Sequence, residues 1–186
     1  MRAPTRRATQ GAALAVALPL AGCASNGTGI LLRDLNGPPP AAGTGLTANM
    51  ESRDDRAEAS IPASADRAFA ALPAVYAALG VPLTAAATGE RVLGLDGAHL
   101  RRIGRDPVSA FLWCGTDAVG LPLTEQYRVT LWVISRVTPA GTGAQLTTRV
   151  FGTAQPQGTS ATTVVCASTG VLEARIAART RAYAAG

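Results

Sequence analysis

The chain has 186 residues, of which 47% are hydrophobic and 16% are charged, so it can form one core of ordinary size but hardly two. Its 17 basic residues are all arginines, and they exceed the 12 acidic residues to give a net charge of +5. Three of these arginines lie in the first 22 residues, so residues 23–186 carry a net charge of only about +2. This small surplus argues against a nucleic-acid-binding protein.

The first 22 residues are typical of a secretory signal peptide. Arg2, Arg6 and Arg7 precede an apolar run over residues 11–21, which matches a charged n-region and a short h-region. A helix that spans a bilayer needs roughly 20 apolar residues. This run is shorter and no later segment of the sequence approaches that length, so we expect the mature protein to span no membrane.

The residues at the end of this run resemble a bacterial lipobox. Leu20-Ala21-Gly22-Cys23 places small residues before a cysteine, and the resemblance implies cleavage before Cys23 and lipidation of that residue. Several acyl chains would hold the protein on a membrane, whereas one myristoyl chain binds only marginally. The alternative is an ordinary secretory signal with an incidental cysteine. Ala24 and Ser25 include no acidic retention residue, so the analogy favours the outer membrane of a diderm cell, facing the periplasm.

Residues 24–56 are predicted to form a flexible linker. They are rich in Gly, Pro and Ala and show no apolar period. A flexible coil of these 33 residues has an end-to-end distance of about 30 Å. Ile30-Leu31-Leu32 is its one apolar spot, either a short piece of local structure or a docking segment. The predicted organisation is therefore a signal peptide (1–22), the lipidated cysteine with its linker (23–56) and a single domain (57–186).

The domain begins with a mixture of short strands and one helix. Ser64 is a good N-cap and Gly80 a good stop, so a helix is predicted between them, with Pro73 expected to kink or divide it. Glycines and a proline interrupt residues 96–117, which are therefore predicted to be a long ordered loop. Short strands are predicted at residues 59–62, 81–87, 91–95 and 111–114.

The clearest pattern is the alternation of apolar and polar residues over 124–137 and again over 145–154, which predicts a long hairpin. The turn between the two strands is predicted to take six residues, 138–143. A short strand at 164–166 follows, and Thr169 is predicted to cap a last helix. Taken together, the elements predict an α+β fold, an antiparallel sheet with helices packed on one face as a two-layer sandwich.

This element order resembles the helix-grip domains of the NlpB/BamC class of outer-membrane lipoproteins. The likeness covers roughly residues 57–186 by element order and only the lipobox by motif. It implies an accessory or scaffold role at the outer membrane and assigns no functional residue.

The hairpin predicts a binding face. If Val137 lies opposite Ala144, Trp132 lies opposite Arg149 on the side away from the helices. Aromatic and arginine side chains together are enriched in protein interfaces. The alternatives are a purely structural stack, or a patch covered by the linker or the 96–117 loop. The predicted patch consists of Trp132, Ile134 and Phe151, edged by Arg128 and Arg149.

Two further sites are predicted in the domain. Cys114 and Cys166 would lie in an oxidising compartment and are expected to form a disulfide. The alternative is two buried free thiols. Arg101, Arg102 and Arg105 could bind a phosphate, a lipid headgroup or a sugar acid, since guanidinium groups suit such anions, or they could simply be solvated.

Catalytic motifs are scarce. His99 is the only histidine, so no zinc site of the usual His/Cys type is expected, and neither G-x-S-x-G nor a lysine-containing phosphate loop occurs in the sequence. We therefore expect no enzyme, no metal and no cofactor. Two functions remain: a noncatalytic lipoprotein that binds an envelope protein, or a carrier or sensor that holds a small apolar or anionic ligand between sheet and helix. A cavity lined by Tyr76, Tyr127 and Leu131 would favour the second.

Overall fold

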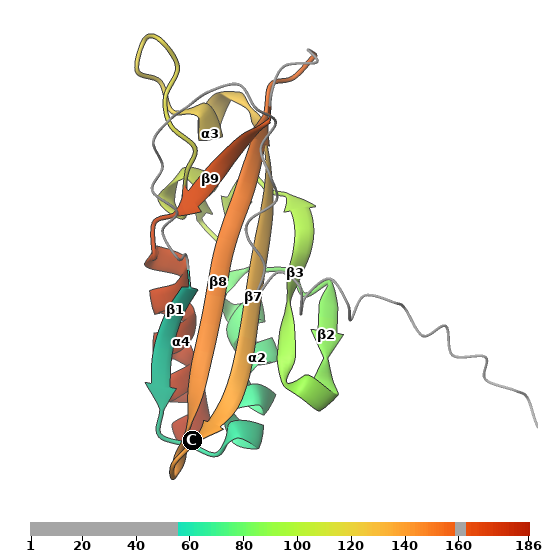
Figure 1. Ribbon diagram of the computed structural model, residues 1–186, viewed down its shortest axis with the longest axis vertical. Coiled ribbons are helices and arrows are strands. Elements are labelled where there is room, and N and C mark those ends of the chain that lie inside the picture. The colour runs from blue at the N-terminus through green and yellow to red at the C-terminus, as the bar shows by residue number, and fades with distance from the viewer. Residues whose placement is uncertain (1–55, 159–162) are drawn as a thin grey trace, which may run out of the picture.

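A computed structural model describes residues 56–158 and 163–186. The predicted signal peptide, Cys23 and linker lie outside the described residues, apart from Arg56 at the start of the first strand. Among the described helices, none is both long and apolar enough to cross a bilayer. Figure 1 shows one long, twisted sheet with both long helices, α2 (Ala65–Leu79) and α4 (Val171–Ala185), on the same face.

The sheet is antiparallel throughout, which confirms the predicted α+β class. Its strand order is β2-β3-β7-β8-β9-β6, and β1 also pairs with β8. Two strands therefore pair with the edge of β8 that lies away from β7: β1 along the first half of β8 and β9 near its end. The strands are β1 (Arg56–Ile61), β2 (Ala85–Ala87), β3 (Val92–His99), β6 (Leu112–Trp113), β7 (Arg128–Ala140), β8 (Gly143–Gln155) and β9 (Val164–Ser168).

The long hairpin of β7 and β8 is present, but its predicted register is wrong. Val137 lies opposite Leu146 instead of Ala144, and Ala140 pairs with Gly143. Gly141 has φ +57°, the left-handed conformation that a tight two-residue hairpin turn requires, so both strands run further than predicted. Because the slip is two residues, each side chain keeps its predicted face of the sheet.

Helix α2 follows its predicted limits. The Ser64 side chain accepts a hydrogen bond from the Arg67 amide at 3.3 Å, and Gly80 ends the helix with φ +74°. Pro73 is exposed and does not divide the helix, which continues to Leu79. Helix α4 corrects another prediction: its N-cap is Gly170, whereas the hydroxyl of Thr169 donates to the main-chain oxygen of Ala110 at 2.9 Å.

The core lies between the helices and the inward face of the sheet and includes a chain of hydroxyl groups. The hydroxyl of Tyr76 is 2.9 Å from that of Ser135, which is 3.0 Å from that of Thr148, and all three side chains are buried. Burial raises the pKa of Tyr76, so its hydroxyl stays neutral. Tyr76 and Leu131 are packed inside this core, whereas Tyr127 lies at one end of the sheet.

The segment predicted as a long loop contains more structure than expected. It holds the end of β3, the two-stranded β4 (Arg102–Ile103) and β5 (Asp106–Pro107), the 3₁₀ turn η2 (Val108–Ala110) and β6. Elsewhere, β2 begins only at Ala85 and is joined to β3 by the 3₁₀ turn η1 (Thr88–Glu90), and the short helix α3 (Leu123–Gln126) occupies the predicted start of β7.

The predicted disulfide between Cys114 and Cys166 is confirmed. Cys114 directly follows β6, and Cys166 is in β9, which pairs with β6. The bond ties the irregular segment after β3 to the sheet.

Candidate binding sites

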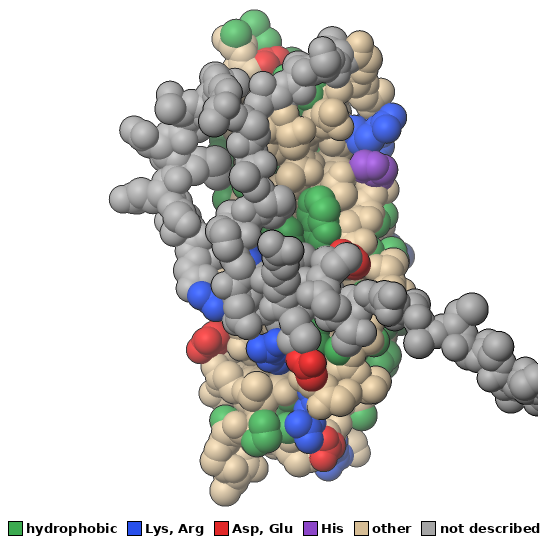
Figure 2. All heavy atoms as spheres, turned by 45° about the vertical axis from the view of Figure 1, so that its right-hand side comes forward, with side chains coloured by type: hydrophobic (Ala, Val, Ile, Leu, Met, Phe, Trp, Pro, Cys, Tyr) green, Lys and Arg blue, Asp and Glu red, His purple; other side chains and the backbone are tan. Residues whose placement is uncertain are grey.

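The outer face of the sheet, away from the helices, carries the predicted aromatic patch. Trp132 and Phe151 are paired across β7 and β8, and their rings stack with centroids 5.3 Å apart and planes 1° from parallel. The guanidinium carbon of Arg149 lies 4.9 Å from the centre of the Phe151 ring. The structure therefore brings together Trp132, Phe151 and Arg149, with Arg149 stacked on Phe151 and not opposite Trp132 as predicted. A small hydrophobic area is visible near the middle of this face in Figure 2.

The prediction that this patch is exposed is wrong. Phe151 is 2% exposed, Ile134 is fully buried and Arg149 is 6% exposed, while Trp132 is half-buried. Ile134 and Phe151 form a second small hydrophobic cluster with Val92 of β3 and Ala87 of β2. The role of these residues in binding stays a prediction.

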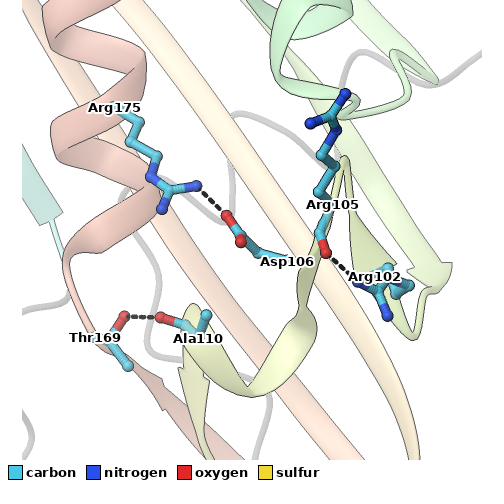
Figure 3. Close-up of polar contacts among 6 residues, drawn as sticks. All are labelled: Arg102, Arg105, Asp106, Ala110, Thr169 and Arg175. Atoms are coloured by element: carbon cyan, nitrogen blue, oxygen red, sulfur yellow. Dashed lines mark hydrogen bonds and ion pairs between the residues drawn. The ribbon is translucent and has the colours of Figure 1, made fainter.

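The three arginines predicted to hold an anion do not surround one site. Arg102 donates from its side chain to the main-chain oxygen of Arg105, and the side chains of these two arginines point away from one another (Figure 3). Asp106, the next residue, forms an ion pair with Arg175 of α4. Arg102 is in β4, whereas Arg105 lies with Gly104, which has φ +57°, in the turn of the β4–β5 hairpin.

A pocket of about 260 Å³ at the end of β3 and β7 collects several predicted residues that the sequence did not connect. Arg101 of the predicted anion site and Arg128 of the predicted patch both line it, together with His99. Leu100 and Val129 contribute apolar surface. Figure 2 shows histidine and basic side chains together near the upper right-hand edge of the molecule. We call this the end pocket, and its polar lining is His99, Arg101, Thr124, Tyr127, Arg128 and Gln157.

A β-bulge determines the position of His99. Leu95 pairs with Val133, but Ala98 pairs with Leu131, so β3 advances one residue more than β7 between these pairs. Without the extra residue, His99 would lie opposite Val129, whose side chain is buried on the helix side. With it, His99 lies opposite Thr130, on the other face of the sheet. The bulge is therefore what turns the only histidine away from the core.

The loop over residues 115–122 presents apolar side chains to solvent. Val119 is 79% exposed and Leu121 is 55% exposed, and Trp113 of the adjoining β6 is 51% exposed. In Figure 1 this loop projects beyond the sheet next to α3. We call Val119 and Leu121 the apolar tip. Sequence reasoning missed them, although two aliphatic residues between Gly115 and Pro122, in a segment too short to form a core element, were a usable signal.

The loop has a fixed internal structure centred on Asp117. One carboxylate oxygen of Asp117 accepts hydrogen bonds from the amides of Leu121 at 2.8 Å and Val119 at 3.0 Å, and the other accepts from the Gln126 side chain at 3.0 Å. These donors, above all the Leu121 amide and the Gln126 side chain, hold the pKa of Asp117 below its usual value. Gly120, with φ +85°, allows the chain to turn between the two apolar residues.

A second pocket, of about 290 Å³, lies between β1, β8 and α4. Its most unusual residue is Glu173, which is 2% exposed and accepts a hydrogen bond from the Ser168 hydroxyl at 2.5 Å. Glu173 is in the first turn of α4, where a carboxylate is favoured by the helix dipole. In the described ranges, no group of three His, Cys, Asp or Glu residues is placed to hold a metal ion.

Comparison with known proteins adds no assignment to these sites. Neither a scan against protein-family models nor a search of curated proteins finds a match to this chain. The resemblance to helix-grip lipoproteins therefore stays a prediction based on the lipobox and the order of the elements.

Proposed function

We propose that this protein is a noncatalytic lipoprotein of the bacterial envelope that binds a partner protein through its apolar tip. The observation that carries the proposal is the exposure of Val119 and Leu121 on a loop whose conformation is fixed by Asp117. Apolar side chains exposed together and surrounded by polar residues commonly indicate an interaction site. Trp113, on the strand that leads into the loop, adds an aromatic side chain of the kind enriched at interfaces.

The rigidity of the loop favours binding. A loop that is already ordered loses little conformational entropy when a partner binds, so more of the contact energy contributes to affinity. The hydrogen bonds to Asp117 order the loop from within, and the disulfide at Cys114 fixes its base. The apolar tip is therefore better suited to a partner than the outer-face cluster, where Phe151 and Ile134 are buried.

The membrane anchor belongs to the proposal and rests on the sequence. The lipobox ending in Cys23 supports lipidation, and the 33-residue linker would let the domain reach about 30 Å from the membrane. The resemblance to outer-membrane lipoproteins supports an accessory or scaffold role in the periplasm. Replacing Cys23 with serine should release the protein from the membrane fraction.

The noncatalytic assignment is supported by what the charged residues do. Asp66 pairs with Arg91 at 2.7 Å and Asp106 with Arg175, and both pairs join separate elements of the fold. Asp117 orders its loop, and Glu173 in the first turn of α4 accepts a hydrogen bond from Ser168 of β9. Each of these contacts has a structural use.

Site-specific cross-linking in cells tests the proposal. A photoreactive residue at position 119 or 121 should give the same cross-linked product, whereas one at position 83 should not. Leu83 is a matched control, because it is also an exposed leucine, at 42%, but precedes β2. No product, or one product shared by all three positions, would contradict the proposal.

Substitutions then distinguish binding to a partner protein from insertion into a bilayer. Val119→Ser combined with Leu121→Ser should abolish the cross-linked product formed from position 113, while Leu83→Ser leaves it unchanged. Purified Cys23→Ser protein should not bind phosphatidylglycerol vesicles. Vesicle binding that is lost in the Val119→Ser, Leu121→Ser protein would instead identify the tip as a membrane-inserting loop.

A further inference from the structure

We infer that the end pocket is a binding site for a phosphate group, a function separate from the apolar tip. The pocket is open to solvent at the side of the sheet, and helix α3, whose Thr124 lines it, directly follows the 115–122 loop. It combines guanidinium, imidazole, phenol, amide and hydroxyl groups from four separate segments of the chain.

The first argument is charge. Arg101 and Arg128 both line the pocket, and within the described residues no acidic side chain does. Arg91 and Arg175, by contrast, form ion pairs with Asp66 and Asp106. Neither Arg101 nor Arg128 donates a side-chain hydrogen bond to any described residue. Because both positive charges line the same pocket, an anion bound there would be attracted by both.

The second argument is the orientation of His99. Its Nδ1 atom is 3.1 Å from the Thr130 hydroxyl and 3.4 Å from the Val129 main-chain oxygen. These contacts fix the ring and leave Nε2 without a partner among the described residues. When the imidazole is protonated, Nε2 is a third donor beside the two guanidinium groups. The β-bulge that turns His99 out of the core thus places a fixed imidazole at the pocket.

The third argument concerns the shape of the ligand. A carboxylate has two oxygens and is satisfied by one guanidinium fork, whereas a phosphate monoester has three free oxygens for donors that approach from different sides. The volume of about 260 Å³ is just below the roughly 300–1,000 Å³ of typical small-molecule sites. It therefore has room for a small group attached to the phosphate. Tyr127 and the apolar residues Leu100 and Val129 offer surface for that group.

Calorimetric titration of the full-length lipidated protein, in neutral detergent, with inorganic phosphate and with glycerol phosphate tests this site. We expect saturable binding of both. Arg101→Gln or Arg128→Gln should each weaken it by roughly tenfold or more, as expected for loss of a hydrogen bond between charged groups. Arg105→Gln is the matched control, because it removes the same charge from an exposed side chain that does not line the pocket, and it should bind as the wild type does.

The source of the phosphate is found by reconstituting the protein into vesicles. If the natural ligand is a lipid headgroup, adding phosphatidic acid, whose phosphate is a monoester, to phosphatidylcholine vesicles should lower the apparent affinity for inorganic phosphate in the wild type, but not change the residual binding of Arg128→Gln. If it is a soluble phosphate ester, the added lipid should change nothing and glycerol phosphate should bind more tightly than inorganic phosphate. Either result supports a phosphate site.

Two results would overturn the inference: the wild type shows no saturable binding of phosphate, or Arg105→Gln weakens binding as much as Arg128→Gln does. The second result would mean that phosphate binding depends only on the net charge of the protein. Unchanged thermal midpoints in the three variants would show that they are folded. The Val119→Ser, Leu121→Ser protein should bind phosphate normally, so the phosphate site and the apolar tip can fail independently.

Discussion

Two short segments between β3 and β7 differ in how they use their apolar residues. The first segment, residues 102–108, contains β4 and β5, and we call it the clip. The second segment is the 115–122 loop. Both turn at glycines with positive φ. Yet Ile103 and Val108 of the clip are 2% and 3% exposed, whereas Val119 and Leu121 of the loop are 79% and 55% exposed.

Ile103 and Val108 belong to the main hydrophobic core, and the contacts of the two segments differ accordingly. The clip is joined to the rest of the fold by the ion pair from Asp106 to Arg175 of α4. Its backbone also touches the end of α2 so closely that a Cβ atom on Gly80 would lie 2.8 Å from the Gly104 nitrogen. In the 115–122 loop, the carboxylate of Asp117 bonds within the loop and to the adjoining Gln126. Contacts to other elements bury a segment, whereas contacts within a loop order it without burying it.

The largest effect is expected from the disulfide, which fixes the start of the 115–122 loop but not the clip. Replacing Cys114 and Cys166 with alanine frees a connection of 52 residues. On the chain-entropy model this lowers the free energy of unfolding by about 4 kcal/mol. Denaturant unfolding of the oxidised wild type and the double variant measures the loss. An unchanged midpoint would show that hydrogen bonding alone positions the loop.

A matched pair of substitutions compares the two segments directly. Ile103→Ala should lower the free energy of unfolding by about 3 kcal/mol, because it leaves a cavity in the core. Leu121→Ala removes an equally large aliphatic side chain but should change stability by no more than about 0.5 kcal/mol, because that side chain is already in water. Equal losses in the two variants, measured by the same denaturant titration, would mean that the 115–122 loop is packed and not available for binding.

The parts of the fold that could be predicted from sequence are those fixed by local chemistry. Alternating side chains in β7 and β8 predict their two faces, and Ser64 and Gly80 predict the limits of α2. The hairpin register could not be predicted, because it depends on whether Gly141 adopts a positive φ, which the sequence permits but does not require.

The candidate sites were harder to predict because tertiary contacts assemble them. Arg101 and Arg128 are 27 residues apart in the sequence, and only the pairing of His99 with Thr130 beyond the bulge brings their segments together. Phe151 likewise stacks on Trp132 and clusters with the small residues of β2, contacts that only the fold provides. Composition identified the residue types in both cases but not their surroundings.

The smallest effect is expected from Asp117→Asn, which tests whether internal hydrogen bonds order the 115–122 loop. The folded-state pKa of Asp117 lies below its usual value of 3.8, so its ionised carboxylate stabilises the loop above pH of about 4. That contribution is lost as the pH falls through the lowered folded-state pKa. At neutral pH, Asp117→Asn should therefore speed amide hydrogen exchange at Val119 and Leu121 without changing exchange in the clip. In the wild type, the NMR shift of the Leu121 amide should titrate with a midpoint below 3.8. A midpoint at or above this value would show that the carboxylate does not hold the loop, and the contrast between the two segments would then need another cause.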